Sequence, residues 1–275
     1  MSYGSSEWQP WVLNEADSLP LLEHAYKSGI NTIDTADIYS HGQSERIIGK
    51  ALKQYNIPRE KIVLLSKCYF GVDESNLGRP IALSSTNDGE TVNTVGLSRK
   101  HIFNAVEKSV ERLGTYIDVL QIHRLDRDTP REEIMKALND VIEKGWVRYI
   151  GASSMAAWEF QTLQNIAEKN GWHKFISMQN YYNLIYREEE REMVRALKAA
   201  FNSPLIHPPD PLLSRHRRRP HPLVSHRTRR PHTPLHRPHL QTRRNRQVRQ
   251  HAHLRPRIRS RQEDHRARRG DREET

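Results

Sequence analysis

Short apolar runs alternate with longer amphipathic stretches along the first 200 residues of this 275-residue chain. The runs are bounded by polar residues and have the length of strands that are buried on both faces. The five runs lie at 31–34, 62–66, 118–122, 147–151 and 175–179. Their starts are 31, 56, 29 and 28 residues apart, and a spacing of about 30 residues corresponds to one strand–helix repeat.

The stretches between these runs carry apolar residues at helical spacing. Helices are predicted at about 18–28, 44–55, 98–113, 131–144, 156–169 and 187–200. Ser98 is suited to be the N-cap of its helix, and Gly145 is a natural residue just beyond a helix end. Strands that alternate with helices predict a parallel sheet, either doubly wound or closed into a barrel. The one long spacing holds a polar segment, about 70–97, that we expect to be an inserted surface loop.

Five strands are fewer than the eight that a closed (β/α)₈ barrel requires. Residues 1–10 could supply the end of an earlier strand. Residues 201–275 have neither strand nor helix periodicity, and Pro recurs throughout them. The pattern therefore divides the chain into a strand–helix body, 1–200, and a tail, 201–275.

Composition changes at the same boundary. The tail contains 20 Arg, no Lys, 6 acidic residues, 10 His and 10 Pro, and Phe201 is its only aromatic residue. It carries a net charge of +14, whereas the body, with 24 basic and 27 acidic residues, carries −3. A segment of this composition cannot bury a core, so we expect the tail to be disordered. The overall charge of +11 belongs to the tail and is weak evidence that the body binds nucleic acid.

Several classes of protein are unlikely on this sequence. No apolar run approaches 18 residues, so no membrane span is expected. The N-terminus has neither the basic nor the apolar region of a secretory signal. Cys68 is the only cysteine, which excludes an internal disulfide and a cysteine-based zinc site. No metal site is expected, and a reducing, cytoplasmic location fits.

Four polar side chains follow successive predicted strands, where barrels and open sheets place their sites. They are Asp34 and Tyr39 after the first strand, Lys67 after the second and His123 after the third. Each alone is more often a turn, packing or solvated residue. Together they suit proton delivery to a carbonyl oxygen, because a lysine beside a tyrosine lowers the tyrosine pKa and an aspartate orients the lysine. Since no side chain supplies hydride, a nicotinamide cofactor is implied.

Five segments resemble the aldo-keto reductase superfamily in order and spacing, with the aryl-alcohol dehydrogenase-like reductases as the nearest subgroup. They are GINTIDTADIYSHGQSERIIGKAL (29–52), IVLLSKC (62–68), IDVLQIHRLD (117–126), GWVRYIGASS (145–154) and ISMQNYYNL (176–184). The resemblance implies a (β/α)₈ barrel, NADPH as cofactor and a small carbonyl or alcohol as substrate. It implies that Tyr39 is the general acid, that Lys67 and Asp34 support it, and that His123 orients the substrate carbonyl. Ser153, Ser154 and Gln179 would bind the nicotinamide carboxamide, although the family commonly has Asn at the position of Ser154.

The resemblance covers about residues 1–200, so we expect an incomplete barrel with a shortened first strand and without its last strands. Three interpretations of residues 201–275 stay open: an out-of-frame translation, a disordered extension, or an arm that binds nucleic acid or acidic surfaces. Open sheet edges predict an unstable or aggregation-prone protein with weak activity. The alternative function is a non-catalytic, reductase-like protein with a basic binding tail.

Other side chains have an ordinary and a functional interpretation. Trp8, Trp11 and Trp158 could line an aromatic substrate pocket, although packing is the more frequent role. Cys68 follows Lys67 but fits a small packing residue better than a reactive thiol. His41 and Gly42 are expected to shape the turn after Tyr39 rather than to react. The 70–97 loop lies beside the end of the Lys67 strand and could help to select the substrate.

Overall fold

The computed structural model describes residues 1–81 and 91–202. Five strands form one parallel sheet, and their order in the sheet is their order in the sequence. The strands are β1 (Thr32–Asp34), β2 (Val63–Cys68), β3 (Ile117–Ile122), β4 (Val147–Ser153) and β5 (Phe175–Gln179). A doubly wound sheet reverses its strand order at a switch point, so this sequential order selects the barrel alternative.

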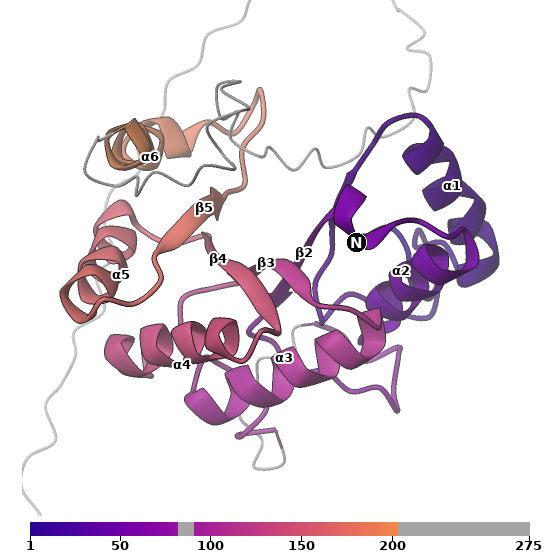
Figure 1. The fold of residues 1–275 in the computed structure, drawn as a ribbon, viewed down its shortest axis with the longest axis horizontal. Coiled ribbons are helices and arrows are strands. Elements are labelled where there is room, and N and C mark those ends of the chain that lie inside the picture. Colours follow the sequence, from indigo (N-terminus) through magenta and orange to yellow (C-terminus); the bar gives the residue numbers. More distant parts are fainter. Residues whose placement is uncertain (82–90, 203–275) are drawn as a thin grey trace, which may run out of the picture. The chain divides into compact units, whose positions relative to one another are not determined.

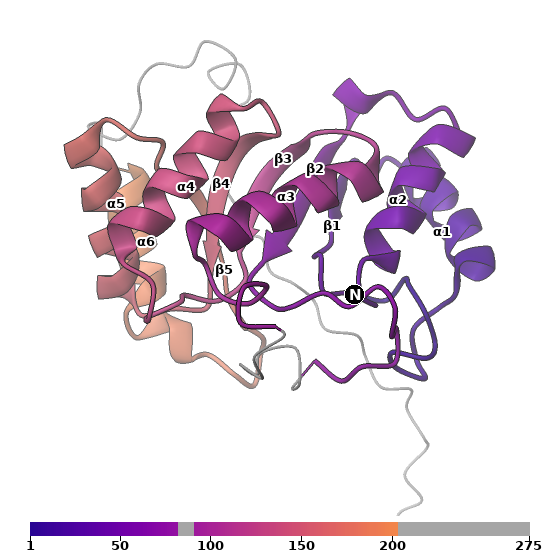
Figure 2. The same ribbon diagram turned by 90° about the horizontal axis from the view of Figure 1, so that it is seen from below.

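The helices follow one another around a single side of the curved sheet (Figures 1 and 2). Each neighbouring pair from α1 to α5 packs together. The helices are α1 (Glu15–Lys27), α2 (Gln43–Gln54), α3 (Arg99–Leu113), α4 (Arg131–Glu143), α5 (Ala157–Asn170) and α6 (Met193–Asn202), with 3₁₀ turns at η1 (Arg59–Lys61) and η3 (Glu188–Glu190). Strand, helix and parallel strand in succession give an incomplete (β/α)₈ barrel, as the sequence predicts.

The main hydrophobic core lies between the sheet and these helices. Alternate strand residues such as Leu64, Leu120 and Ile150 are buried in it, because successive side chains of a strand point to opposite faces. The residues between them lie on the other face. Lys67 and Gln121, on this opposite face, are direct neighbours in the β2–β3 ladder. The fold therefore gathers polar strand residues on the face that the helices leave uncovered.

Both predicted helix-end signals are confirmed. The Ser98 hydroxyl accepts a hydrogen bond of 3.2 Å from the backbone N–H of His101 at the start of α3. Gly145 follows α4 with a φ of +79°, a conformation that favours glycine. One prediction is wrong in extent: the helix expected at 187–200 begins only at Met193. Glu188–Glu190 instead form a short turn, in which Glu190 is held by Tyr182 and Arg187.

The predicted loop at 70–97 connects β2 to α3, and its described parts, 70–81 and 91–97, contain no strand or α-helix. The proposed tail falls almost entirely outside the described residues, since these end at residue 202. Its disorder, its origin and the domain boundary at residue 200 therefore stay predictions. Within the described part of the chain, no helix combines the length and the apolar character needed to cross a bilayer.

Candidate active site

The four predicted catalytic residues come together at the carboxyl ends of three neighbouring strands. Asp34 is the last residue of β1, Lys67 is the next-to-last residue of β2, and His123 directly follows β3. Tyr39 lies in the connection between β1 and α2. Because the strands are parallel and adjacent, their carboxyl ends meet at one edge of the sheet. The topology thus brings together residues that are up to 89 positions apart in the sequence.

Lys67 is the buried centre of this group. Only 2% of its side chain is exposed, and its Nζ donates to both carboxylate oxygens of Asp34 at 2.9 and 2.8 Å. A third hydrogen bond, of 2.8 Å, goes to the backbone oxygen of Thr35. The three contacts involve one carboxylate and one backbone carbonyl. Lys67 is therefore fixed in place, and Asp34 compensates its buried charge.

Tyr39 lies beside this ion pair. Lys67 Nζ is 5.2 Å from the centroid of the Tyr39 ring. Burial raises the pKa of Tyr39 above its ordinary value of 10, and the positive charge of Lys67 acts against this rise. Lys67 thus works in the predicted direction, but desolvation of the phenolate is the larger effect. Tyr39 is consequently a protonated phenol at neutral pH, which is the state that a proton donor requires.

His123 stands edge-on to Tyr39, with ring centroids 5.8 Å apart. Burial, together with the charges of Lys67 and Arg124, holds the pKa of His123 well below its usual 6.5. The imidazole is therefore neutral and carries one N–H donor. Its buried Nδ1 finds no hydrogen-bond partner among the described residues. A neutral imidazole beside a phenol can donate a hydrogen bond to a carbonyl oxygen without competing for its proton.

Gln121 is a member of the site that the sequence analysis missed. Its Nε2 donates to Asp34 Oδ1 at 3.2 Å, so Asp34 is held by both Gln121 and Lys67. The period of two along a strand offered a signal: Gln121 lies two residues before His123 and must share its face.

Asp37 is another buried polar residue that the sequence analysis did not single out. Its carboxyl is completely buried, and neither oxygen has a hydrogen bond of ordinary geometry within the described residues.

The predicted cofactor residues lie at the ends of the next two strands. Ser153 and Gln179 are paired in the β4–β5 ladder, and the Ser154 N–H donates to the Gln179 backbone oxygen at 3.2 Å. The two serine hydroxyls are 3.3 Å apart. Nearby in the chain, the buried Ser177 Oγ and Asn180 Oδ1 lack partners among the described residues. Hydroxyls and unpaired amide or hydroxyl oxygens at one sheet edge fit an amide-bearing group such as a nicotinamide.

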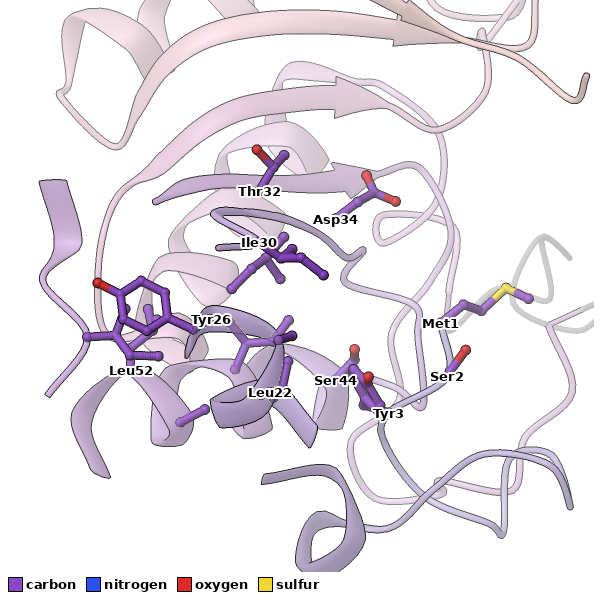
Figure 3. Close-up of a pocket in the computed structure, with 15 residues that line it drawn as sticks. Met1, Ser2, Tyr3, Leu22, Tyr26, Ile30, Thr32, Asp34, Ser44 and Leu52 are labelled. Atoms are coloured by element: carbon purple, nitrogen blue, oxygen red, sulfur yellow. The ribbon is translucent and has the colours of Figure 1, made fainter. Parts of the chain in front are cut away.

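A cavity of about 320 Å³ adjoins the site between α1, α2 and the edge of the sheet at β1 (Figure 3). Its lining is mainly apolar, and Asp34 is the one predicted catalytic residue in it. Met1 also lines this cavity.

The remaining candidate side chains, three tryptophans and Cys68, differ in burial and in their neighbours. Trp8 is buried beside Tyr39, with ring centroids 6.1 Å apart, whereas Trp11 and Trp158 are exposed. Of the three tryptophans, Trp8 is the one with a ring contact to a proposed catalytic residue. Cys68 is buried in the helix-facing core, and burial raises its thiol pKa well above the usual value. This supports the interpretation of Cys68 as a packing residue.

Comparison with known sequences agrees with this geometry. The profile of the Aldo/keto reductase family matches residues 1–252. A versiconal hemiacetal acetate reductase of Aspergillus parasiticus is 73% identical over 195 residues, which cover 70% of this chain and 57% of the relative. The protein named "Putative aryl-alcohol dehydrogenase C977.14c" in Schizosaccharomyces pombe is 57% identical over 201 residues, again 70% of this chain and 57% of the relative. The matches thus span little more than half the length of these two relatives.

Proposed function

Since this chain belongs to the aldo/keto reductase family, we propose that it is an NADPH-dependent oxidoreductase that reduces an aldehyde or ketone to an alcohol. The observation that carries the proposal is the buried Lys67–Asp34 ion pair beside Tyr39 and His123. This arrangement holds a protonated phenol and a neutral imidazole at one edge of the sheet. These are the two groups needed to protonate and to orient a carbonyl oxygen.

Each residue has a defined role in the proposed reaction. When bound, the reduced nicotinamide supplies hydride to the carbonyl carbon, and Ser153, Ser154 and Gln179 would bind its carboxamide. Tyr39 Oη donates its proton to the carbonyl oxygen, so that the C=O bond becomes an alcohol. Lys67 stabilises the phenolate left behind, and Asp34 with Gln121 keeps Lys67 in position. His123 orients the carbonyl oxygen toward Tyr39.

The surroundings of Tyr39 and His123 favour an aromatic substrate. Trp8 lies against Tyr39 and Phe70 against His123, with ring centroids 6.1 and 5.1 Å apart. A planar aryl group can stack between such rings. The A. parasiticus relative is named for a hemiacetal acetate, so a carbonyl masked as a hemiacetal belongs among the substrates to test. A small aromatic aldehyde is the first probe, and a cytoplasmic location is part of the proposal.

The central test replaces Tyr39 with phenylalanine. Tyr39→Phe removes only the phenolic oxygen and is expected to lower kcat for NADPH-dependent aldehyde reduction by about 10²–10⁴-fold. Binding of NADPH, followed by fluorescence titration, should stay unchanged, because Tyr39 is not among its proposed ligands. Tyr116→Phe is the matched control, since Tyr116 precedes β3 at the opposite end of the sheet. Equal turnover by Tyr39→Phe and the unaltered protein would refute the mechanism.

The non-catalytic alternative makes the opposite prediction for the unaltered chain. It requires that no carbonyl substrate supports NADPH oxidation, and that nucleic acid binds in a salt-sensitive manner. Deleting residues 201–275 should then abolish that binding. The same deletion leaves all the proposed catalytic residues in place but removes part of the region that matches the family profile, which extends to residue 252. Retained NADPH-dependent aldehyde reduction together with lost nucleic-acid binding would therefore separate the two functions.

A further inference from the structure

The connection that leaves β2 brings an aromatic side chain to the proposed substrate site. Tyr69 and Phe70 directly follow the strand, and their rings meet edge-to-face at 5.1 Å. Phe70 also meets the His123 ring edge-to-face at 5.1 Å. The position of Phe70 relative to His123 thus depends on how the segment that follows it, residues 71–81, is held.

His41 binds this segment at two points. The backbone N–H of Asp73 donates to His41 Nδ1 at 3.1 Å, and His41 Nε2 lies 2.8 Å from the backbone oxygen of Arg79. Since Nδ1 accepts a hydrogen bond, the ring proton must be on Nε2, which donates to the carbonyl. His41 is completely buried. The imidazole therefore links both ends of the turn at 73–79 to the loop that carries Tyr39.

The backbone around His41 has a left-handed conformation that the surrounding residues must stabilise. Ser40 and His41 have φ values of +50° and +49°, and Gly42 follows at +91°. A left-handed conformation is unfavourable for a non-glycine residue and persists only where the surroundings enforce it. The Ser5 N–H, which donates to Ser40 Oγ at 3.0 Å, provides one such restraint. The two hydrogen bonds of His41 to the 73–79 turn provide the other.

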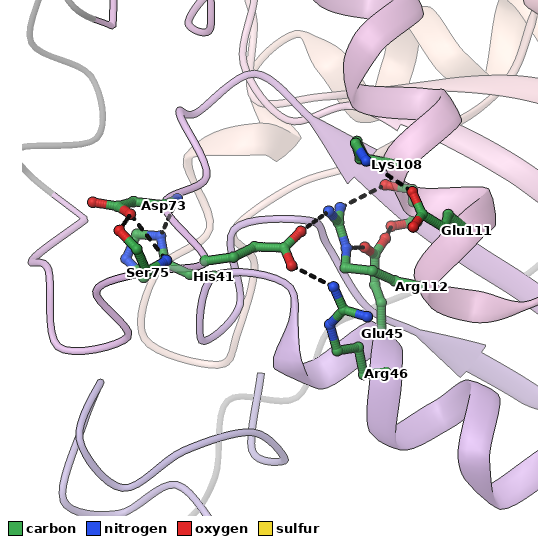
Figure 4. A network of polar contacts seen from close by, with 11 residues as sticks. His41, Glu45, Arg46, Asp73, Ser75, Lys108, Glu111 and Arg112 are labelled. Carbon is green, nitrogen blue, oxygen red and sulfur yellow. Dashed lines mark hydrogen bonds and ion pairs between the residues drawn. The ribbon is translucent and has the colours of Figure 1, made fainter.

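A salt-bridge network holds the same turn from the opposite side (Figure 4). Glu74 accepts from Arg112 Nη1 at 2.8 Å and also pairs with Arg46. Arg112 in turn donates to the buried Glu45 at 2.7 Å. Adjacent residues of the turn, Asp73 and Glu74, are therefore attached to His41 and to the α2–α3 pair respectively. A turn held at both sides cannot shift without breaking one attachment.

We propose that His41 is a positioning residue that fixes the 73–79 turn and thereby sets Phe70 against His123, where it forms one wall of the substrate site. The proposal rests on the proposed reductase function. It assigns His41 no contact with substrate and no proton transfer. It adds to the expectation that His41 shapes its own turn, because the structure shows that its side chain holds a second segment.

Two substitutions of similar size separate the hydrogen bonds from simple packing. Gln has one amide donor and one amide acceptor, so His41→Gln can replace both bonds, whereas His41→Leu can replace neither. Both variants place a non-glycine residue in the same left-handed backbone conformation, so backbone strain does not distinguish them. His173→Gln is the matched control, because His173 bonds to Asn139 away from the 73–79 turn.

The first readout is hydrogen–deuterium exchange of the peptide that contains residues 71–81, measured on the full chain. We expect His41→Leu to raise exchange at Asp73 by about tenfold, which corresponds to about 1.4 kcal/mol of lost protection. The exchange rate of His41→Gln should be closer to that of the unaltered protein, and the rate of His173→Gln should equal it. Equal protection in all four proteins would overturn the proposal, whether or not any of them reduces a carbonyl.

The second readout is kinetic. With an aromatic aldehyde, His41→Leu should raise KM by about tenfold while kcat changes by less than about threefold, because ground-state binding is lost but Tyr39 and Lys67 are intact. His41→Gln should recover most of the KM. A loss of exchange protection without a change in KM would show that the turn does not position Phe70 for substrate. If no protein reduces any carbonyl, the reductase function fails, and the exchange result alone decides whether His41 holds the turn.

Discussion

Tyr39 illustrates how two opposing effects decide the state of a single residue. Burial raises its pKa above 10, and Lys67 limits the rise without cancelling it. The phenol therefore stays protonated through the neutral range, and the rate of carbonyl reduction should be nearly flat from about pH 6 to pH 9. The reverse reaction needs the phenolate, so alcohol oxidation should keep rising with pH across this range.

Initial rates in both directions over the same buffers measure this difference. Lys67→Met sharpens the test, because removing the positive charge raises the pKa of Tyr39 further and should displace the rising limb of oxidation to higher pH. An oxidation rate that levels off below about pH 8 would indicate a phenol of lowered pKa. Burial would then not dominate at Tyr39.

Asp37 is a completely buried carboxyl whose negative charge the fold stabilises poorly. Burial raises its pKa well above 3.8, and Glu45 adds to the rise, while Arg112 opposes it. Between pH 3.8 and the folded pKa, the native state holds a proton that the unfolded chain has lost, so this residue makes stability fall as pH rises. Asp37→Asn removes the dependence. We expect a gain in unfolding free energy of roughly 1–3 kcal/mol at pH 7 and almost none at pH 4.

Urea unfolding of both proteins at the two pH values measures this gain. The exposed Asp128 provides a matched control, and Asp128→Asn should change stability little at either pH. A gain for Asp37→Asn that is equal at pH 4 and pH 7 would mean that folding does not raise the pKa of the Asp37 carboxyl. Its removal would then act through packing alone.

The proposed catalytic residues could be selected from the sequence because their types and their places after strands are local properties. Asp34, Tyr39, Lys67 and His123 each required only a strand end in the sequence and the assumption of a parallel sheet. The partners of these residues could not be found in the same way. Gln121 contacts Asp34 across two strands, and His41 contacts Asp73 and Arg79 through the path of an irregular connection. Such contacts depend on where side chains point in the folded chain, which a short sequence pattern does not specify.

At the scale of elements, hydrophobic periodicity located all five strands but not their exact ends. The run at 62–66 becomes β2 at Val63–Cys68, because pairing with β3 extends the strand through Cys68. The helix predicted from residue 187 begins at Met193, since Glu190 is engaged by Tyr182 and Arg187. Core-facing positions thus specify the type of an element, whereas its ends are decided by hydrogen bonds and ion pairs formed in the folded chain.

The two edge strands of the described sheet bear on whether the molecule associates with other copies of itself. Strands β1 and β5 each pair on one side only within residues 1–81 and 91–202. Just beyond β5, Leu184 and Ile185 are 92% and 96% exposed, and Tyr181 is also exposed. Single exposed apolar residues are common, but an apolar group beside a strand edge favours association. We therefore expect this chain to self-associate through the segment that follows β5.

Replacing Leu184 and Ile185 together by lysine tests this expectation. The two charges should weaken self-association by roughly tenfold, or about 1.4 kcal/mol, with no loss of unfolding free energy, because neither side chain is buried. Sedimentation velocity over a range of protein concentrations measures the association. The control replaces Leu21 and Val92, which are exposed but distant in sequence from β5, by lysine. If both double variants reduce association equally, then added charge rather than the segment after β5 controls it, and the strand edge is not the site of contact.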